Sequence, residues 1–442
     1  MDVTINNIAK IRSAKLVCQG LTAIIGDNDK GKSTVGKVLY SVYHTFSNLK
    51  EGFFDARAGY VLDSLKLRNT NLTRRLFRAD WFSSDAPIAD EDLEQILQFH
   101  LRHGLSRQSF STVVSSRLHR ESAQELMEDI KLQIKKARGI SEMVLFRDAV
   151  QFDLNRYFNT QFLPNYFDSK GESEISITIK GRKIVAKWNA NEQPMVVEEF
   201  LHNDAWFIGT PLIMDALGAS LRMTSWTIGD SINRELASRI RRARPRSSIA
   251  RRVADEELST VYGMIDSYLS GDFSVGKDGE LEVGISGMNK PLNVANLSMG
   301  IKMLALLRLM VDVNLLKRKD VLILDEPENH LHPELQVLFA DVIVELQRVY
   351  DLTVLVTTHS PYFLQSLELS ARKKRAEDGE GETLRVYQPK TVDDLGRVEF
   401  EDVSNDTSSM YRKFARTMRE LELERMKIAE LEKSIADNGV QD

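Results

Sequence analysis

Short alternating or fully apolar runs open the chain and predict three strands. The runs are Val3–Ile5, Lys15–Val17 and Leu21–Ile25, and a glycine-rich segment follows the last of them. Apolar residues then recur at helical spacing, which predicts a helix with one buried face. That face consists of Val35, Val38, Leu39, Val42 and Phe46.

The middle of the chain changes from a helical to an alternating pattern. Residues 48–153 are mostly polar with helical spacing and have no sustained heptad repeat, so we expect a helical insertion there. Ser173–Trp188 alternates on both sides of a glycine-containing turn and predicts a hairpin. Asp272–Val283 predicts a second hairpin, with Lys277, Asp278 and Gly279 at its turn.

The last third alternates strand and helix patterns, which is typical of a parallel sheet covered by helices. Its elements are a long apolar helix after Leu297, a strand at Val321–Leu324, a helix at Pro333–Tyr350 and a strand at Leu352–Thr357. Leu384–Val403 suggests two edge strands, and Ser408–Ile435 predicts a solvated helix. The predicted fold class is α/β, with a mixed or parallel sheet, flanking helices and an inserted helical subdomain.

Composition narrows the class of protein only a little. The net charge is −5, with 42% hydrophobic and 28% charged residues, so any nucleic-acid surface must be local. Cys18 is the single cysteine, which excludes a disulfide within the chain and a cysteine-based metal site. Charged residues interrupt the apolar stretch Ile301–Leu316, so it predicts a buried helix and no membrane span. We expect a cytoplasmic protein without a membrane partner.

The segment after the third predicted strand carries the first chemical motif. It reads GDNDKGKS and matches G-x-x-x-x-G-K-[ST] in full. Glycines let backbone N–H groups surround phosphates, and the following helix directs its positive end at them. Lys32 is expected to reach the β- and γ-phosphates and the Ser33 hydroxyl to bind Mg²⁺. The predicted nucleotide-binding residues are Gly26, Asp27, Asn28, Asp29, Lys30, Gly31, Lys32, Ser33 and Thr34.

Two carboxylates end the predicted strand Val321–Leu324. Asp325 and Glu326 follow four apolar residues, and the carboxyl end of such a strand is where open α/β sheets bind ligands. We expect Asp325 to hold Mg²⁺ and Glu326 to polarise the attacking water as a general base. An acidic pair alone is a weak signal, but the phosphate loop strengthens it.

Three further motifs resemble those of one family. Asp325–Pro333 reads DEPENHLHP and resembles the Walker B motif and D-loop of ABC/SMC ATPases in their OLD-like and RecF-like branches. Asn296–Lys302, NLSMGIK, resembles the ABC signature, and Thr357–Pro361, TTHSP, resembles the switch-histidine segment. The phosphate loop is similar to the family's GxNGxGKS, except that Asp29 stands where that loop has a glycine.

The resemblance implies a mechanism and a division of the chain. In this family the signature of one subunit completes the ATP site of another, so Ser298 and Gly300 would bind the γ-phosphate in trans, with Lys302 as a helper. His359 would contact the γ-phosphate or the attacking water, and Asn329–His332 would follow the dimer seam. The expected catalytic residues are Lys32, Glu326 and His359. An ABC-type head would comprise residues 1–47, with the phosphate loop, and 154–442, with the other motifs, separated by the insertion at 48–153.

Several residues allow two interpretations. Gln161 is a candidate for the family's Mg²⁺-binding glutamine, although an ordinary surface glutamine is the simpler interpretation. His330 and His332 lack a visible third ligand, so we interpret them as loop histidines. The arginine-rich segment Arg239–Arg252 fits contact with a nucleic-acid backbone as well as it fits a helix face paired with Asp255, Glu256 and Glu257.

The resemblance also suggests a biological role. The chain has neither the long heptads of an SMC arm nor a convincing Toprim acidic pattern after His359. It is therefore similar to the ATPases of antiphage systems, such as PtuA of Septu and AriA of PARIS, in which an ABC-type ATPase controls a separate nuclease or toxin. We expect an ATP-hydrolysing homodimer, or a higher homo-oligomer, with such an effector as partner. The alternatives are a RecF-like DNA-repair clamp and a slowly hydrolysing, nucleotide-dependent scaffold.

Overall fold

In the computed structural model the chain divides into two compact units, which contain most of the predicted elements. One unit comprises residues 1–40 and 161–442, and the other comprises residues 41–160. The described residues are 1–47, 57–61, 64, 120–141, 144, 154, 156–157, 172–188, 195–197, 201, 203–218, 231–243, 256–269, 271–276, 280–285, 287–329, 331–379 and 384–438. Most of the expected insertion at 48–153 therefore lies outside the described residues, and α6 (Arg120–Arg138) is its longest described helix.

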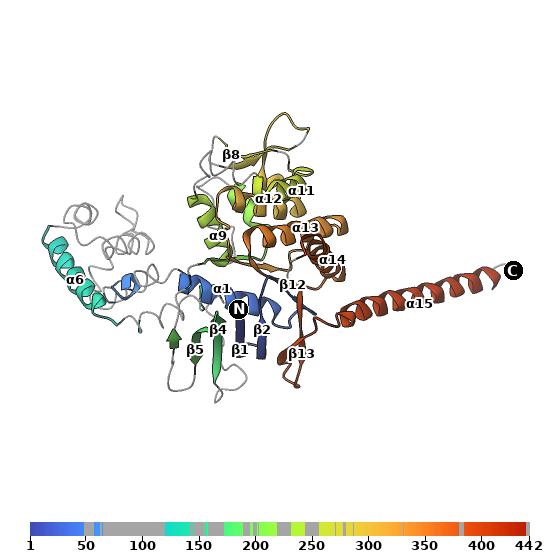
Figure 1. Ribbon diagram of the computed structural model, residues 1–442, viewed down its shortest axis with the longest axis horizontal. Coiled ribbons are helices and arrows are strands. Elements are labelled where there is room, and N and C mark those ends of the chain that lie inside the picture. Colours follow the sequence, from blue (N-terminus) through green and yellow to red (C-terminus); the bar gives the residue numbers. More distant parts are fainter. Residues whose placement is uncertain are drawn as a thin grey trace. The chain divides into compact units, whose positions relative to one another are not determined.

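A parallel group of strands forms the centre of the larger unit (Figure 1). In spatial order it contains β7 (Ala205–Ile208), β11 (Val321–Asp325), β12 (Thr353–Thr358), β3 (Leu21–Ile25) and β13 (Arg385–Thr391). Adjacent strands of this group pair in parallel. The first four are buried almost throughout, as expected of strands covered on both faces.

The sheet continues beyond β13 to eleven strands among the described residues. The additional strands are β14 (Val398–Asp402), β2 (Ile11–Val17), β1 (Asp2–Ile8), β4 (Ser173–Ile179), β5 (Arg182–Trp188) and β6 (Met195–Val197). The prediction that Leu384–Val403 forms edge strands is wrong, because β13 and β14 lie between β3 and β2. Their alternating sequence predicted strands correctly, but their neighbours come from the opposite end of the chain.

Helices and the sheet enclose one large apolar cluster that includes residues of β3, β11 and β12. The helices that contribute buried apolar side chains to it are α8 (Ile213–Gly218), α9 (Ser231–Arg242), α11 (Ser259–Asp266), α12 (Met299–Asp312), α13 (Pro333–Tyr350) and α14 (Pro361–Asp378). The cluster fixes the carboxyl ends of β11 and β12, where the sequence places its acidic and histidine motifs.

Two further helices and a second, smaller sheet belong to the described structure. The helix α1 (Lys32–Ser47) follows β3 and buries Val35, Val38, Leu39, Val42 and Phe46, as predicted. A small antiparallel sheet contains β8 (Phe273–Val275), β9 (Leu281–Val283) and β10 (Leu292–Asn293). The C-terminal helix α15 (Ser408–Asn438) is one continuous helix (Figure 1).

Candidate functional site

The phosphate loop connects β3 to α1, and two glycines determine its conformation. Gly26 has φ +142° and Gly31 has φ +75°, backbone angles that L-residues with side chains rarely adopt. A Cβ atom on Gly31 would lie 3.2 Å from Cγ1 of Ile11, so the loop packs directly against β2 at this point. The sequence motif thus corresponds to a tight turn immediately before the N-terminus of a sixteen-residue helix.

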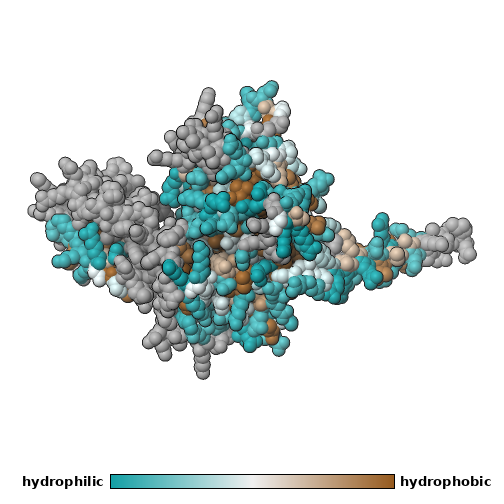
Figure 2. All heavy atoms as spheres, viewed as in Figure 1, coloured by the Kyte–Doolittle hydropathy of each residue, from teal (hydrophilic) through white to brown (hydrophobic). Residues whose placement is uncertain are grey.

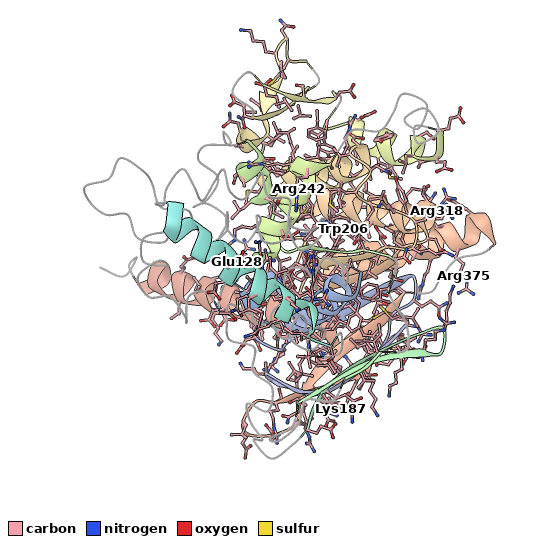
Figure 3. The ribbon with its side chains drawn as sticks, turned by 90° about the vertical axis from the view of Figure 1, so that its left-hand side faces the viewer. Glu128, Lys187, Trp206, Arg242, Arg318 and Arg375 are labelled. Carbon is pink, nitrogen blue, oxygen red and sulfur yellow. The ribbon has the colours of Figure 1, made fainter. Side chains whose placement is uncertain are left out.

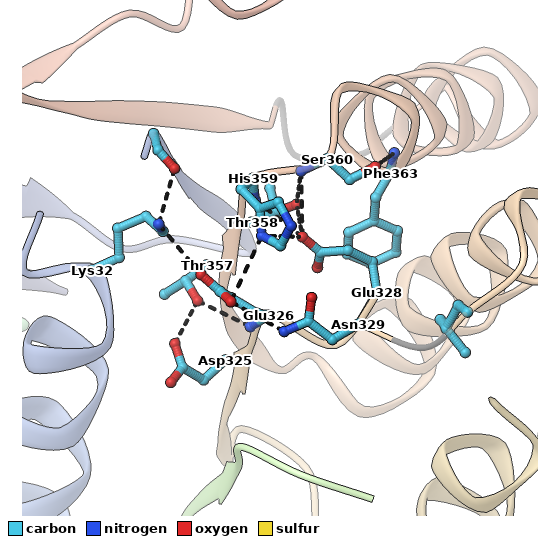
Figure 4. A network of polar contacts seen from close by, with 12 residues as sticks. Lys32, Asp325, Glu326, Glu328, Asn329, Thr357, Thr358, His359, Ser360 and Phe363 are labelled. Atoms are coloured by element: carbon cyan, nitrogen blue, oxygen red, sulfur yellow. Dashed lines mark hydrogen bonds and ion pairs between the residues drawn. The ribbon is translucent and has the colours of Figure 1, made fainter. Parts of the chain in front are cut away.

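Lys32 lies at one side of a polar network around Glu326 (Figure 4). Its side chain is only 3% exposed, and Nζ donates hydrogen bonds to the carbonyl oxygens of Gly26, at 2.9 Å, and Asp27, at 2.7 Å. Nζ also lies 3.3 Å from Oε1 of Glu326. The two residues predicted to act on the phosphates and on the water are therefore in contact.

The unusual Asp29 of the loop is neutralised by a neighbour outside the motif. Its φ of 61° is left-handed, which explains why a glycine is expected there and why an aspartate is tolerated. The Asp29 carboxylate pairs with the ammonium of Lys10, between β1 and β2, and this hydrogen bond holds the pKa of Asp29 below its usual range. The adjacent Lys30 donates a hydrogen bond of 2.9 Å to Thr391.

Thr357 of β12 positions both acidic residues at the end of β11. Its hydroxyl donates to Oδ1 of Asp325 at 2.5 Å and accepts from the backbone N–H of Glu326 at 3.0 Å. Asp325 and Thr357 are register partners in the parallel β11–β12 pair, so the sheet itself produces this contact. Glu326 has φ 50°, a strained value for a residue with a side chain, and such strain occurs frequently at functional sites.

The two carboxyl groups differ in electrostatic environment. Burial raises the pKa of Asp325, although hydrogen bonds from Thr357 and Ser33 oppose that effect. Burial also acts to raise the pKa of Glu326, but Asn329, Lys32 and His359 outweigh it, so the pKa lies below its usual value. Asn329 Nδ2 donates to Oε2 of Glu326 at 3.1 Å, and His359 Nδ1 lies 3.6 Å from the same oxygen. Glu326 is therefore ionised at neutral pH, as a residue that polarises water must be.

A third acidic residue, Glu328, was missed by the sequence analysis as a separate functional residue. It is buried, and its Oε1 accepts from the hydroxyl of Thr358 at 2.5 Å and from the backbone N–H groups of His359, at 3.0 Å, and Ser360, at 3.3 Å. Its other oxygen, Oε2, is buried without a hydrogen-bond partner. The only sequence signal is the second glutamate of DEPE, which looks like a solvated loop residue.

Glu328 and Gln336 together anchor the segment that carries His359. Ser360 caps α14 by accepting from the backbone N–H of Phe363 at 3.2 Å, and its hydroxyl also donates to Gln336 of α13 at 2.9 Å. His359 itself remains exposed, with Nδ1 3.5 Å from Oε1 of Glu328. The predicted switch histidine therefore extends to the surface from a rigid base, next to Glu326.

The signature segment begins α12. Ser298 is exposed at the N-cap position, and its side chain makes no capping hydrogen bond to the helix. Gly300, two residues further and in the first turn of α12, is buried. The side chain of Lys302 is buried, and its ammonium pairs with Asp215 of α8. Lys302 therefore joins α12 to α8, and its role as a helper at the phosphate stays a prediction.

Two predicted residues, Gln161 and His330, lie outside the described residues. His332 is exposed at the N-cap of α13, in keeping with its interpretation as a loop histidine. Across the part of the chain that the structure describes, no three His, Cys, Asp or Glu residues form a group that could hold a metal ion. A cation at Asp325 would therefore need oxygen atoms from Ser33, water and a nucleotide as well.

The described part of the arginine-rich segment mostly stabilises the protein itself. Arg239 pairs with Asp204 at 2.9 Å and stacks on Trp206, with its guanidinium carbon 3.9 Å from the ring centroid. Arg241 donates to the carbonyl oxygen of Ala216. Arg242 is exposed and lies 3.6 Å from Glu235 (Trp206 and Arg242 are labelled in Figure 3). The remaining arginines of the segment, Arg244, Arg246, Arg251 and Arg252, lie outside the described residues.

The fold and the site define an α/β domain with a P-loop between β3 and α1. The chain belongs to the family AAA_21, described as "AAA domain, putative AbiEii toxin, Type IV TA system", whose profile matches residues 21–365. That match spans β3 to α14 and so includes the phosphate loop, the signature, the acidic pair and His359. No curated protein matches the chain.

Solved structures similar to the chain include several SMC heads. The SMC head domain from Thermotoga maritima is 11% identical, with a TM-score of 0.38, over 91% of this chain and 98% of that chain. An SMC head bound to the C-terminal winged-helix domain of ScpA is 12% identical, with a TM-score of 0.41, over 92% and 98% of the two chains. An SMC head with an extended coiled coil, bound to the C-terminal domain of ScpA from Pyrococcus furiosus, is 9% identical, with a TM-score of 0.34, over 94% and 98%. Among the described helices, none is long and apolar enough to cross a membrane.

Proposed function

We propose that this protein hydrolyses ATP as a homodimer in which two nucleotides are held between the subunits. The proposal rests on one observation: the residues around the phosphate loop contact one another, whereas the signature residue Ser298 is exposed and free to meet another subunit's nucleotide. Lys32 and His359 both contact Glu326, and Thr357 links Glu326 to Asp325, so these residues already form one connected group. Ser298 instead presents an exposed hydroxyl at a helix N-terminus, where an anion is favourable.

The residues at the end of β11 fit a Mg²⁺-bound nucleotide. The half-buried Asp325 carboxylate accepts a hydrogen bond from the Ser33 hydroxyl, and hard oxygen donors of this kind are what Mg²⁺ prefers. The cation would supply positive charge to the β- and γ-phosphates. Lys32 would exchange its carbonyl acceptors for phosphate oxygens, and the ionised Glu326 would accept the proton of the attacking water. His359, from its position beside Glu326, would contact the γ-phosphate.

We extend the proposal to a regulatory role, in which nucleotide-dependent closure controls a separate nuclease or toxin in bacterial antiphage defence. Two features support it. The motif DEPENHLHP resembles the soluble OLD-like branch, and the family description assigns the domain itself, as a "putative AbiEii toxin", to a toxin–antitoxin system, which is a two-component arrangement. Purification of the chain from its native gene context, followed by identification of the bound proteins, tests this role. Recovery of the ATPase without a nuclease or toxin would contradict it.

Subunit mixing tests whether the ATP site is shared between subunits. Ser298→Arg should block hydrolysis by a homodimer because its guanidinium fills the space for the partner's γ-phosphate, and Lys32→Ala should block it by removing the phosphate contact. A mixture of the two variants forms heterodimers with one intact loop opposite one intact Ser298. We expect the mixture to regain a substantial part of the wild-type ATPase rate. A mixture as inactive as its components, or full activity of Ser298→Arg alone, would contradict the shared site.

A further inference from the structure

The C-terminal helix exposes an unusual number of large apolar side chains. Met410 and Tyr411, in its first turn, pack against the core of the larger unit. Further along, six large apolar side chains are half or more exposed, and apolar and polar spheres alternate along the helix (Figure 2). They are Met418 (50%), Leu421 (63%), Leu423 (53%), Met426 (63%), Ile428 (51%) and Leu431 (61%). Side chains of this size are rarely left together in water on a solitary helix.

Four of the six share one side of α15. At about 100° per residue, Leu421 and Ile428 lie within about 20° of each other, and Met418 and Leu431 flank them within about 60–80°. Leu423 lies about 160° from Leu421, on the opposite side. We call Met418, Leu421, Ile428 and Leu431 the α15 stripe. Leu421 and Ile428 are seven positions apart, the spacing that brings residues to the seam between two paired helices.

The charges of α15 are divided unequally along its length. Residues 412–419 contain four basic residues and no acidic residue, whereas residues 420–437 contain six acidic residues and three basic residues. Two copies in parallel would place basic next to basic and acidic next to acidic. Two antiparallel copies place the basic part of each helix beside the acidic end of the other. The helix is therefore complementary in charge to a reversed copy of itself.

We propose that α15 pairs with α15 of a second copy of this chain in an antiparallel coiled coil, with the α15 stripe as its seam. Such pairing covers the four apolar side chains that the chain itself leaves exposed. It needs no nucleotide, so it holds two copies together whether or not their heads close around ATP. It goes beyond the proposed function, because it predicts a dimer that persists in the nucleotide-free state.

Sedimentation of the full chain without nucleotide tests the pairing. The wild type should be a dimer. The double variant Leu421→Glu/Ile428→Glu should raise the dissociation constant of the dimer at least tenfold and so sediment mainly as a monomer. The matched control is Leu423→Glu combined with Met426→Glu, which places the same charges on other sides of the helix. This control should leave the dimer intact. Lys32→Ala should also remain a dimer, which separates this contact from nucleotide-driven closure. A monomeric wild type, or equal effects of the two glutamate pairs, would overturn the proposal.

Cysteine crosslinking tests the orientation. Cys18 is buried and its pKa is raised to about 12, so it contributes little background. Arg425 lies near the middle of the segment 412–437 and meets its own copy in an antiparallel pair, so Arg425→Cys should crosslink. Met418 lies towards one end, so Met418→Cys should crosslink only in a parallel pair. Crosslinking of both variants would establish a parallel pair, and crosslinking of neither would assign the stripe to a different partner; both outcomes contradict the proposal.

Discussion

The Nζ atom of Lys32 lies 3.3 Å from Oε1 of Glu326, although the two residues belong to opposite ends of the predicted head. Lys32 also donates to two loop carbonyls, so three oxygen atoms surround its ammonium. A bound γ-phosphate would attract this ammonium and release Glu326 to accept a proton from water. The contact thus joins the phosphate loop and the acidic end of β11 into one site.

Lys10 should support nucleotide affinity indirectly, because it neutralises the negative charge of Asp29 in the phosphate loop. Without its partner, the Asp29 carboxylate would add an uncompensated negative charge beside the phosphate loop. We expect Lys10→Met to weaken ATP binding about three- to fivefold at low salt, with a smaller effect at high salt. The measurement is equilibrium titration with ATP at two ionic strengths.

A second substitution makes this test specific. In an Asp29→Gly background, Lys10→Met should have no further effect, because the charge that Lys10 neutralises is gone. Lys15→Met, which removes an exposed lysine from the same hairpin, is the matched control and should bind ATP normally. An equal loss of affinity from Lys10→Met in both backgrounds would mean that Lys10 acts independently of Asp29.

Glu328 should be needed to hold the switch segment in place. Glu328→Ala leaves three hydrogen-bond donors without their acceptor, which we expect to destabilise the fold by about 2–4 kcal/mol. Glu328→Gln can keep an acceptor at the same point but removes the charge, so it should fold well and lower kcat about tenfold while KM for ATP changes less than about threefold. Denaturant unfolding and steady-state ATPase kinetics separate these effects.

The control for Glu328 is an exposed carboxylate of the same region. Glu334→Gln, in the first turn of α13, should leave both stability and kcat at wild-type values. Because Nδ1 of His359 lies 3.5 Å from Oε1 of Glu328, Glu328→Gln should also change the pH profile of kcat. A pH profile and a kcat identical to those of the wild type would show that the charge of Glu328 has no positioning role.

The buried Glu345 should make the free energy of unfolding fall as the pH becomes acidic. Burial alone would raise its pKa, but Arg348 and Lys374 outweigh that effect and lower the pKa below the ordinary value of about 4.5. A lowered pKa in the folded state means that the stabilisation is present above the unfolded pKa and is lost as the pH falls through the folded value. The ion pair with Lys374, at 3.3 Å, joins α13 to α14 behind the switch segment.

Removal of Lys374 tests this linkage. Lys374→Met should lower the free energy of unfolding by about 1–2 kcal/mol at pH 7, and the difference from the wild type should shrink in acid as Glu345 becomes protonated. The neighbouring exposed lysine supplies the control, since Lys373→Met should have little effect at either pH. A difference that stays constant from pH 7 to pH 3 would show that the effect of Lys374→Met does not depend on the charge of Glu345.

The sequence alone was sufficient to predict the elements that local pattern and local chemistry determine. Apolar runs predicted β3, β11 and β12, and helical spacing predicted the buried face of α1. Parallel strands that end in polar motifs meet at one edge of a sheet, so the sequence could also predict that Glu326 lies near Lys32 and His359.

Properties that depend on distant partners could not be predicted. The strands β13 and β14 have the pattern of edge strands, but they lie inside the sheet because β2 and β3 flank them. Lys302 follows the signature as a phosphate-binding lysine would, and only Asp215, on α8, shows why it is buried. In the sequence Glu328 has the pattern of a surface residue, and its burial depends on hydrogen bonds from Thr358, His359 and Ser360, which are about 30 positions away.

The central claim is that Lys32 and Glu326 act on the same Mg-ATP, the first to bind it and the second to hydrolyse it. The most direct test measures ATP affinity and ATP turnover side by side for the wild type, Lys32→Ala and Glu326→Gln. We predict that Glu326→Gln binds ATP within a few-fold of the wild type but loses at least about a hundredfold in turnover, and that Lys32→Ala loses both. Wild-type turnover by Glu326→Gln, or wild-type affinity of Lys32→Ala, would contradict the account.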